Sequence, residues 1–307
     1  MLALFPERLA ENQVHIAFIG MGEAAGAFIT GWGADRAGEI TTFDIKTTVP
    51  DTAPDIVRRA AEYGIRQCNT LKDAVSDADV VFSTVTADQA ITAARAAAPV
   101  MKQGAYFLDM NSCAPASKQV SAGIMAEHDV RYVDVAVMEP VYPKQLDVPL
   151  LISGQWSGDV LDILAQLSLN FRIIEGAVGR ASSIKMVRSI MVKGLEALTA
   201  ECALAAHAAD VMDEVFPSLR DGHPNIDVQQ RATYNFERSM THGIRRAAEM
   251  DEVAKMVADL GLPNDLARAT AHWQRVIADN TLDRTATKQG RDLQSLVDEL
   301  LPRIRGD

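Results

Sequence analysis

The first half of the chain alternates short apolar runs with longer amphipathic segments. Each apolar run is too short for a helix and is bounded by glycine or polar residues, a pattern typical of buried strands. We expect such strands at residues 14–19, 40–43, 79–85, 106–110 and 130–137, and edge strands at 150–153 and 171–175. Helical patterns fill the intervals, at 53–63, 91–98, 115–127 and 158–167. Strand and helix in turn, with short connections, predict an α/β fold built on a doubly wound parallel sheet.

The pattern changes near residue 179, and the rest of the chain is predicted to be all-helical. A proline-free helical run extends from Ala181 to about Met212, and a polar break at 216–227 separates it from a second helix at 228–260. One or two further helices complete the chain. We therefore expect two domains, at 1–178 and 179–307, since 307 residues are enough for two cores. The first long helix outruns a small domain, so we expect it to span the domain junction and to contribute to a homodimer interface.

A glycine-rich turn joins the first predicted strand to the helix that follows it. The turn has the form G-x-G-x-x-A from Gly20 to Ala25. In such a turn the first glycine permits a tight bend, the second lets the backbone approach a pyrophosphate, and the small third residue lets the helix pack on the strand. The phosphates would lie at the helix N-terminus, where N–H groups and the helix dipole favour anions. The strand before and the helix after make this a predicted dinucleotide-binding domain of the Rossmann type.

Asp44 follows the second predicted strand, about twenty residues beyond the glycine turn. A carboxylate there accepts hydrogen bonds from the adenosine ribose hydroxyls and repels a 2′-phosphate, so Asp44 favours NAD over NADP. Lys46, two residues on, leaves NADP open, and Asp44 could instead serve as a strand-end turn residue. The cofactor-binding residues that we predict are Gly20, Met21, Gly22, Glu23, Ala24, Ala25, Asp44, Lys46, Thr84, Val85 and Asn111.

Polar residues follow the strand predicted at 106–110. Ligands of doubly wound sheets bind at the carboxyl ends of the strands, so Asn111 and Ser112 are candidates to contact a ligand. Either residue could instead cap the helix that begins near Pro115. The next strand runs into a rigid segment with two prolines, residues 134–143, which either lines a pocket or only turns the chain.

One lysine lies in an otherwise apolar stretch, residues 179–194, at the start of the first long helix. Ser182, Lys185, Arg188 and Ser189 are three or four residues apart and therefore share one helix face. Burial and the like charge of Arg188 both favour a neutral Lys185 amine, which is a proton acceptor near neutral pH. The alternative is a surface lysine on an amphipathic helix. Lys185 is our candidate catalytic residue.

A stripe of polar and basic residues recurs along the second long helix and consists of Arg231, Asn235, Arg238, His242 and Arg245 or Arg246. It could be a solvated polar face with ion pairs. A basic stripe in an acidic protein also suggests a small anionic ligand, and the planar fork of Arg188 suits a carboxylate. The substrate-binding residues that we predict are Asn111, Ser112, Arg188, Ser189, His242 and Arg246.

Composition narrows the classes of partner. The net charge of −11 argues against a nucleic-acid-binding protein. No apolar run is long enough to cross a bilayer and the first residues lack the pattern of a secretory signal, so we expect no membrane partner. The cysteines, Cys68, Cys113 and Cys202, have neither disulfide nor zinc spacing, which suits a reducing cytoplasm. No cluster of His, Asp or Glu has metal-site spacing, so we predict no metal.

These motifs, in this order, resemble the β-hydroxyacid dehydrogenase family, which includes 3-hydroxyisobutyrate and 6-phosphogluconate dehydrogenases. The resemblance rests on G-x-G-x-x-A at 20–25, D-x-N-S-x-x-P at 109–115, D-x-A-V at 134–137 and a lysine that enters a long helix at 184–189. It covers nearly the whole chain, and the C-terminal helices resemble those of phosphogluconate-dehydrogenase-like oxidoreductases. The resemblance implies an NAD(P)-dependent dehydrogenase that oxidises a small 3-hydroxy acid or sugar acid, with Lys185 as the acid/base.

Two positions depart from the family pattern. Ser189 stands where the family usually has an asparagine, and Met138-Glu139-Pro140 replaces a Ser-Gly-Gly that offers donors to the substrate carboxylate. These departures keep two alternatives open: an imine or other carbonyl reductase on the same fold, and a non-catalytic nucleotide-binding regulatory protein. Lys185 argues against imine reduction, because members with that chemistry usually lack the lysine.

Overall fold

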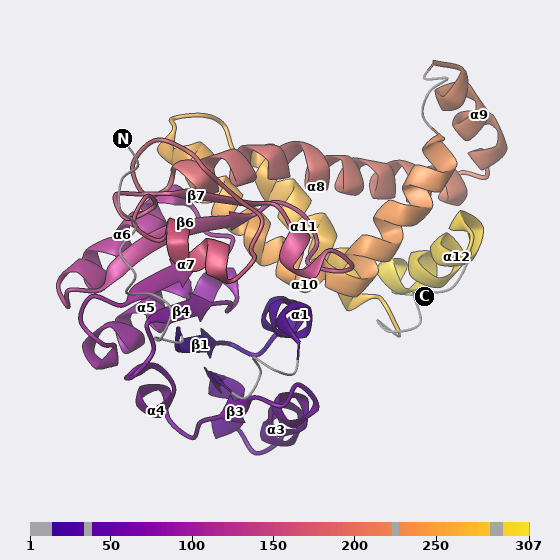
Figure 1. Cartoon of the computed structure of the whole chain (residues 1–307). Helices are drawn as coiled ribbons and strands as arrows, with labels where there is room; N and C mark the ends of the chain where they lie inside the picture. The colour runs from indigo at the N-terminus through magenta and orange to yellow at the C-terminus, as the bar shows by residue number, and fades with distance from the viewer. Residues whose placement is uncertain (1–13, 34–38, 223–226, 283–290, 307) are drawn as a thin grey trace. The chain divides into compact units, whose positions relative to one another are not determined.

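The structure is a computed structural model and describes residues 14–33, 39–222, 227–282 and 291–306. The chain divides into two compact units. Figure 1 labels helices and strands of both. Unit 1 contains the described residues up to Asn111 and those from Pro115 to Ser183. Unit 2 contains Ser112–Ala114 and the described residues from Ile184 onward. The division therefore falls inside the long helix α8 (Arg180–Ala208), a few residues beyond the expected position, and the segment 112–114 belongs with the helical unit.

Unit 1 is built on an eight-stranded sheet in the order β3-β2-β1-β4-β5-β6-β7-β8. The strands are β1 (Ile16–Ile19), β2 (Ile40–Phe43), β3 (Arg66–Gln67), β4 (Val80–Ser83), β5 (Tyr106–Asp109), β6 (Arg131–Val137), β7 (Leu150–Ser153) and β8 (Phe171–Ile173). Strands β1 to β6, which occupy one side of the sheet in the order β3-β2-β1-β4-β5-β6, all pair in parallel with their neighbours. Strand β7 pairs antiparallel with β6, and β8 pairs parallel with β7. The predicted doubly wound α/β fold is confirmed, but the sheet is not parallel throughout.

The reversal at β7 follows from the connection that precedes it. A parallel neighbour needs a crossover connection, usually an α-helix, across one face of the sheet. Residues 138–149, all of them described, contain only the short 3-10 helix η4 (Gln145–Asp147), so the chain turns back beside β6. The expectation that β7 is an edge strand was wrong, because β8 lies outside it.

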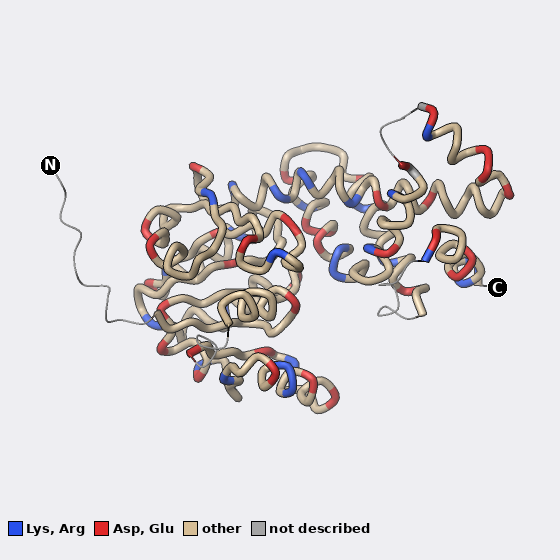
Figure 2. Tube along the Cα trace, turned by 45° about the vertical axis from the view of Figure 1, so that its right-hand side comes forward, with Lys and Arg blue, Asp and Glu red and all other residues tan. Residues whose placement is uncertain are grey.

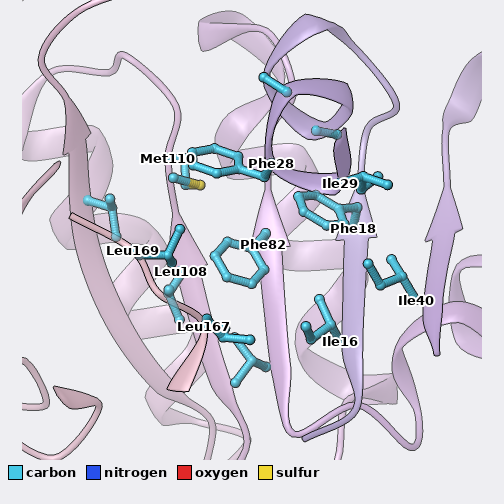
Figure 3. Close-up of a cluster of buried hydrophobic side chains, with 14 of the residues drawn as sticks. Ile16, Phe18, Phe28, Ile29, Ile40, Phe82, Leu108, Met110, Leu167 and Leu169 are labelled. Carbon is cyan, nitrogen blue, oxygen red and sulfur yellow. The ribbon is translucent and has the colours of Figure 1, made fainter. Parts of the chain in front are cut away.

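Helices cover both faces of the sheet. The helices of unit 1 are α1 (Glu23–Trp32), α3 (Ala53–Glu62), α4 (Leu71–Val75), α5 (Ala90–Ala97), α6 (Pro115–Ala126) and α7 (Leu161–Gln166). Helices α1, α3 and α7 pack on the face that carries Phe18 and Phe82 (Figure 3). Helices α4, α5 and α6 pack on the face that carries Ala17 and Val81. Successive strand residues therefore enter opposite cores, and strands buried on both faces read as continuous apolar runs.

Unit 2 is helical over all the residues that the structure assigns to secondary structure. After α8 come α9 (Met212–Gly222), α10 (Val228–Asp259), α11 (Asp265–Asp279) and α12 (Leu293–Arg305). One core includes Phe236 and Leu296, and a second includes Met186 and Met250. Gly243 lets α10 approach α11 closely, because a Cβ there would lie 2.4 Å from the Gln274 carbonyl oxygen.

The predicted polar break at 216–227 was wrong over its first part, because residues 216–222 belong to helix α9. Pro217 and the polar residues around it suggested a break. In the structure Phe216 is buried in the core of unit 2, and this tertiary packing outweighs the poor local propensity. The part of the predicted break at 223–226 lies outside the described residues.

Candidate active site

The glycine turn between β1 and α1 requires glycine at its first position. Gly20 has φ of +93°, and a Cβ there would lie 2.8 Å from the Thr84 carbonyl oxygen. The Thr84 hydroxyl donates to the Gly20 carbonyl oxygen at 2.9 Å, and the Val85 side chain lies next to the same turn. Gly22 differs, because a Cβ there would meet open space. Thr84 and Val85, which were predicted to bind the cofactor, thus support the backbone of the glycine turn, and their contact with the cofactor stays a prediction.

The acid at the end of β2 also contacts this turn. Asp44 accepts hydrogen bonds from the Met21 N–H at 2.8 Å and from the Lys46 N–H at 2.9 Å. It therefore also shapes its own strand end, as the alternative interpretation proposed. Arg59 on α3 donates to the Met21 carbonyl oxygen at 2.6 Å. Sequence reasoning missed Arg59, because only the tertiary fold brings α3 to the glycine turn.

Three observations show that these residues fit a dinucleotide. Helix α1 begins at Glu23, and Gly22 before it supplies no side-chain cap, so the N-terminus of this helix is suited to a pyrophosphate. The open space at Gly22 lies where the pyrophosphate of such folds approaches the backbone. The third observation concerns a buried amide at the end of β5.

The side-chain amide of Asn111 has hydrogen-bond partners within unit 1 for its NH2 group. Its Nδ2 donates to Ser83 Oγ at 2.9 Å and to Asp109 Oδ1 at 2.8 Å. Because a carboxylate only accepts, these bonds fix the orientation of the amide. Among the described residues the buried Oδ1 has no hydrogen-bond partner. An orphaned acceptor at the carboxyl end of a central strand suits a carboxamide N–H donor such as that of nicotinamide.

A buried ion network links the end of β5 to the start of α8 inside unit 1. The Lys118 ammonium lies 3.0 Å from Asp109 Oδ1 and 3.6 Å from Asp134 Oδ1, and all three side chains are almost fully buried. Asp134 in turn accepts from the Gly179 N–H at 3.0 Å and from the Ser182 hydroxyl at 2.6 Å. The network therefore holds the first turn of the helix that carries Lys185.

Lys185 and Ser112 meet within unit 2, where the Lys185 ammonium donates to Ser112 Oγ. The segment 112–114 is fixed by α10, since the Ala114 N–H donates to Glu252 Oε2 at 2.9 Å. Ser112 follows Asn111 directly in the chain. Ser112 was predicted either to contact a ligand or to cap a helix, and its hydroxyl is engaged by the candidate catalytic lysine.

Two further ionisable residues lie near Ser189: Lys193 on α8 and Glu249 on α10. The Lys193 ammonium lies 3.2 Å from Ser189 Oγ and 2.7 Å from Glu249 Oε2. Burial raises the pKa of Glu249, but Lys193, Lys185 and Arg245 outweigh burial and hold the pKa well below its usual range. Sequence reasoning missed both residues. Lys193 could have been found from its spacing, because it lies eight residues, about two turns, beyond Lys185.

Some residues of the basic stripe of α10 are buried and others are exposed. Arg246 is buried and pairs with Glu196 of α8, which also accepts from Gln274 at 2.9 Å. This contact gives Arg246 a role in helix packing, and its predicted role toward a substrate stays a prediction. Partial burial, followed by the charges of Arg246 and Arg245, lowers the pKa of Arg238. Acidic and basic positions are interspersed along these helices (Figure 2).

The remaining predicted substrate contacts lie in different settings. Ser189 is buried beside Lys193, His242 is half-buried, and Arg188 is exposed. Glu139, of the segment that departs from the family pattern, pairs with Lys144 at 2.6 Å in unit 1. The described residues contain no group of His, Cys, Asp or Glu that could hold a metal ion. No helix within the described ranges is long and apolar enough to cross a membrane.

Comparison with known proteins agrees with this arrangement. Residues 15–139 match the NAD binding domain of 6-phosphogluconate dehydrogenase, and residues 206–277 match a domain of unknown function, DUF1932. A conserved hypothetical protein from Sinorhizobium meliloti 1021 is 32% identical over 95% of this chain and 97% of its own, with a TM-score of 0.69. The conserved protein MTH1747, of unknown function and structurally similar to 3-hydroxyacid dehydrogenases, is 27% identical over 86% of this chain and 98% of its own, with a TM-score of 0.60.

More distant solved structures share the fold. The 3-hydroxyisobutyrate dehydrogenase of Mycobacterium tuberculosis, solved with L-serine, is 16% identical over 92% of this chain and 98% of its own, with a TM-score of 0.64. Imine reductases from Myxococcus stipitatus, one a variant bound to NAD+ and one bound to NADP+, have TM-scores of 0.54 and 0.52. An NAD-binding Rossmann domain followed by helices, the first with a lysine in its opening turns, defines a hydroxyacid-dehydrogenase-like protein. The chain belongs to the β-hydroxyacid dehydrogenase family.

Proposed function

We propose that the protein is an NAD-dependent dehydrogenase that oxidises a small anionic 3-hydroxy acid or sugar acid, with Lys185 as the acid/base. The observation that carries the proposal is the hydrogen bond between the Lys185 ammonium and Ser112 Oγ. Ser112 follows the strand end that carries the orphaned Asn111 acceptor. A proton-transferring group is thereby tied to a segment where the fold is suited to a nicotinamide.

The chemistry assigns one task to each of these residues. Oxidation of an alcohol to a carbonyl removes a hydride from carbon and a proton from the hydroxyl oxygen. The bound NAD supplies the hydride acceptor. Neutral Lys185 takes the proton, and in the reverse direction its ammonium polarises the carbonyl oxygen and returns the proton. Ser112 Oγ, which accepts from the Lys185 ammonium, orients the amine and the substrate hydroxyl.

An anionic substrate is favoured by a group of basic residues on α8 and α10. Lys185, Lys193, Arg238, Arg245 and Arg246 interact there with the carboxylates Glu196 and Glu249. Burial, followed by repulsion from Arg246, lowers the pKa of Arg238, and an anion bound nearby would offset the repulsion. Exposed Arg188, one turn from Lys185, offers a two-pronged donor for a carboxylate.

NAD is proposed over NADP because of Asp44. Its carboxylate lies against the glycine turn, where it would repel a 2′-phosphate. Two basic residues contact the same region through other atoms: the Lys46 backbone N–H donates to Asp44, and the Arg59 guanidinium donates to the Met21 carbonyl oxygen. Imine reductases of this fold bind NAD+ or NADP+, so the fold itself accommodates both.

A substrate panel tests the reaction class. The protein is mixed with NAD and a series of 3-hydroxy acids and sugar acids, and reduced nicotinamide is followed by absorbance. In parallel, 3-oxo acids and cyclic imines are supplied with NADH. We expect turnover with at least one hydroxy acid and its oxo partner. Turnover of imines alone would identify a reductase, and silence across both panels with NAD bound would favour the non-catalytic alternative.

A further inference from the structure

We infer that the buried pair formed by Lys193 and Glu249 sets the proton affinity of Lys185. The inference deepens the proposed function and rests on it, because it assigns Lys193 and Glu249 as positioning residues that act through Lys185. It is carried by the placement of these side chains on α8 and α10. Neither residue touches the reacting atoms in this account.

The geometry of α8 places the two lysines on one face. Side chains of a helix tilt toward its N-terminus, so residues two turns apart direct their ends along the same stripe. The small Ser189 lies between the two lysines, and its hydroxyl is 3.2 Å from the Lys193 ammonium. Lys193 is therefore directed back along the helix toward Lys185, past a residue that leaves room for it.

The pair itself is removed from water. The Lys193 side chain is 6% exposed, the Glu249 side chain is 14% exposed, and the Lys193 ammonium lies 2.7 Å from Glu249 Oε2. An ion pair so placed is screened little by solvent, so its charges act strongly on neighbours. Breaking such a pair by removing one member leaves an uncompensated buried charge.

Glu249 interacts with both lysines. Although burial raises its pKa, the charges of Lys193, Lys185 and Arg245 hold it ionised, in that order of strength. The charged groups that act on Glu249 are Lys193, Lys185 and Arg245. On α8 itself, Arg188 lies one turn beyond Lys185. One carboxylate thus serves two ammonium groups.

This sharing has a consequence for acid/base chemistry. A base for alcohol oxidation must exist in its neutral form near working pH. If Lys185 were the only partner of Glu249, losing its proton would leave a bare carboxylate in the interior, and the ammonium would be strongly favoured. Because Lys193 keeps Glu249 compensated and also repels a second ammonium, Lys185 can alternate between its two forms.

The experiment measures the titration of Lys185 without any substrate. Acetic anhydride reacts with neutral amines only, so the extent of Lys185 acetylation against pH, read by mass spectrometry of its peptide, gives a titration midpoint. The full-length protein is used as wild type and as the variants Lys193→Met, Lys193→Arg, Glu249→Gln and the double variant Lys193→Met/Glu249→Gln. Glu299→Gln is the matched control, because Glu299 is a half-buried carboxylate of α12 that pairs with Arg291.

The two single changes are expected to act in opposite directions. Lys193→Met removes a repelling charge and raises the midpoint of Lys185 by roughly one pH unit or more, whereas Glu249→Gln removes an attracting charge and lowers it by a similar amount. Lys193→Arg keeps the charge and restores the wild-type midpoint, and Glu299→Gln leaves it unchanged. A purely structural role would move both single variants in the same direction or neither.

A midpoint of Glu249→Gln that stays within the error of wild type would overturn the inference. In the double variant the two shifts oppose each other, so its midpoint is expected to lie close to wild type and well above that of Glu249→Gln. The comparison of Glu249→Gln with the double variant keeps the test decisive if Lys193→Met fails to fold, because the double variant removes both buried charges. The midpoint does not depend on turnover. Opposite shifts of the Lys185 midpoint in a protein that is inactive on every substrate would support this inference and refute the proposed dehydrogenase. Turnover of a hydroxy acid without these shifts would support the dehydrogenase and refute this inference.

Discussion

At the scale of single residues, the two glycines of the glycine turn are required for different reasons. Gly20 is needed by the fold, because its φ is +93° and the Thr84 carbonyl oxygen lies where a Cβ would be. Gly22 has neither constraint, since a Cβ there meets open space. The structure thus assigns the conformational role to the first glycine and leaves ligand approach as the reason for the second.

The pair Gly20→Ala and Gly22→Ala tests this division. Gly20→Ala is expected to lower the free energy of unfolding by about 1–2 kcal/mol or more, because it strains the backbone. Gly22→Ala should leave stability unchanged but weaken NAD binding at least about tenfold, which corresponds to ~1.4 kcal/mol. Thermal unfolding and NAD titration measure both, with Gly123→Ala as the control, since a Cβ at that position on α6 also meets open space. Wild-type NAD affinity in Gly22→Ala would contradict the proposed phosphate site.

Cofactor choice is tested at Asp44. Asp44→Asn removes the charge that repels a 2′-phosphate. The Met21 and Lys46 N–H groups donate to different oxygens of Asp44, so the single amide oxygen of asparagine keeps one of these two hydrogen bonds. We expect the ratio of NAD to NADP affinity to fall by about tenfold or more, with a loss of stability of about 1 kcal/mol. The two dissociation constants are measured by fluorescence titration. An unchanged ratio would show that Asp44 does not select the cofactor.

Residue positions were predictable from the sequence where local order determines them. Gly20, Gly22 and Asp44 lie at fixed distances from a strand end, so their placement followed from spacing. Arg59, Glu249 and Glu252 could not be found in this way, because each reaches its partner across a tertiary contact. Arg246 shows the converse, since a helical stripe in the sequence does not reveal that Glu196 lies against it.

At the scale of elements, the start of α8 depends on charges buried beneath it. Asp134 of β6 binds the Gly179 N–H and the Ser182 hydroxyl, and Lys118 of α6 balances Asp134 and Asp109 together. The helix that carries Lys185 is therefore anchored by a carboxylate that accepts its first donors. The sequence showed D-x-A-V as a motif but not this use of its aspartate.

Lys118→Met is expected to destabilise unit 1 by about 3–5 kcal/mol, because it leaves two buried carboxylates without their cation. The matched control is Lys102→Met, which removes an exposed lysine paired with Asp79 at 2.6 Å and should cost within ~1 kcal/mol. Urea unfolding followed by circular dichroism measures both. Equal effects of the two changes would refute the anchoring role of the network.

Element prediction succeeded where burial and local pattern agree. The central strands were found because burial on both faces makes them apolar throughout. The short elements β3 and α4 carry too few residues to show a period, and α9 was missed because the burial of Phe216 overrides its proline. The direction of β7 could not be predicted, because it depends on the connection 138–149, which is long enough for a short crossover helix but contains only η4.

At the scale of the whole molecule, the two-part organisation was predictable because the hydrophobic pattern changes once, near residue 179. The membership of 112–114 in the helical unit was not, since it rests on the contacts of Ser112 with Lys185 and of Ala114 with Glu252. The homodimer stays a prediction. Helix α8 offers a surface for it, because Val187, Met191, Leu195 and Leu198 lie on one face and are all exposed.

Met191→Glu places a charge in the centre of this apolar face. If the face joins two copies of the chain, we expect the variant to sediment as a monomer at concentrations where the wild type is a dimer. Leu266→Glu is the control, because Leu266 is a similarly exposed apolar residue on α11, 80% exposed, away from the α8 face in sequence. A monomeric wild type, or dissociation by both variants alike, would contradict the assignment of this face.

The central claim, that Lys185 moves the proton for a reaction carried by NAD, is tested most directly by Lys185→Met. The measurement is kcat/KM on a substrate that turns over, together with the NAD dissociation constant of the same variant. We expect a loss of about 10²–10⁴-fold in kcat/KM with NAD affinity unchanged, because general acid/base catalysis contributes on this order. Turnover retained at the wild-type level in a variant that binds NAD normally would contradict a role for Lys185 in proton transfer.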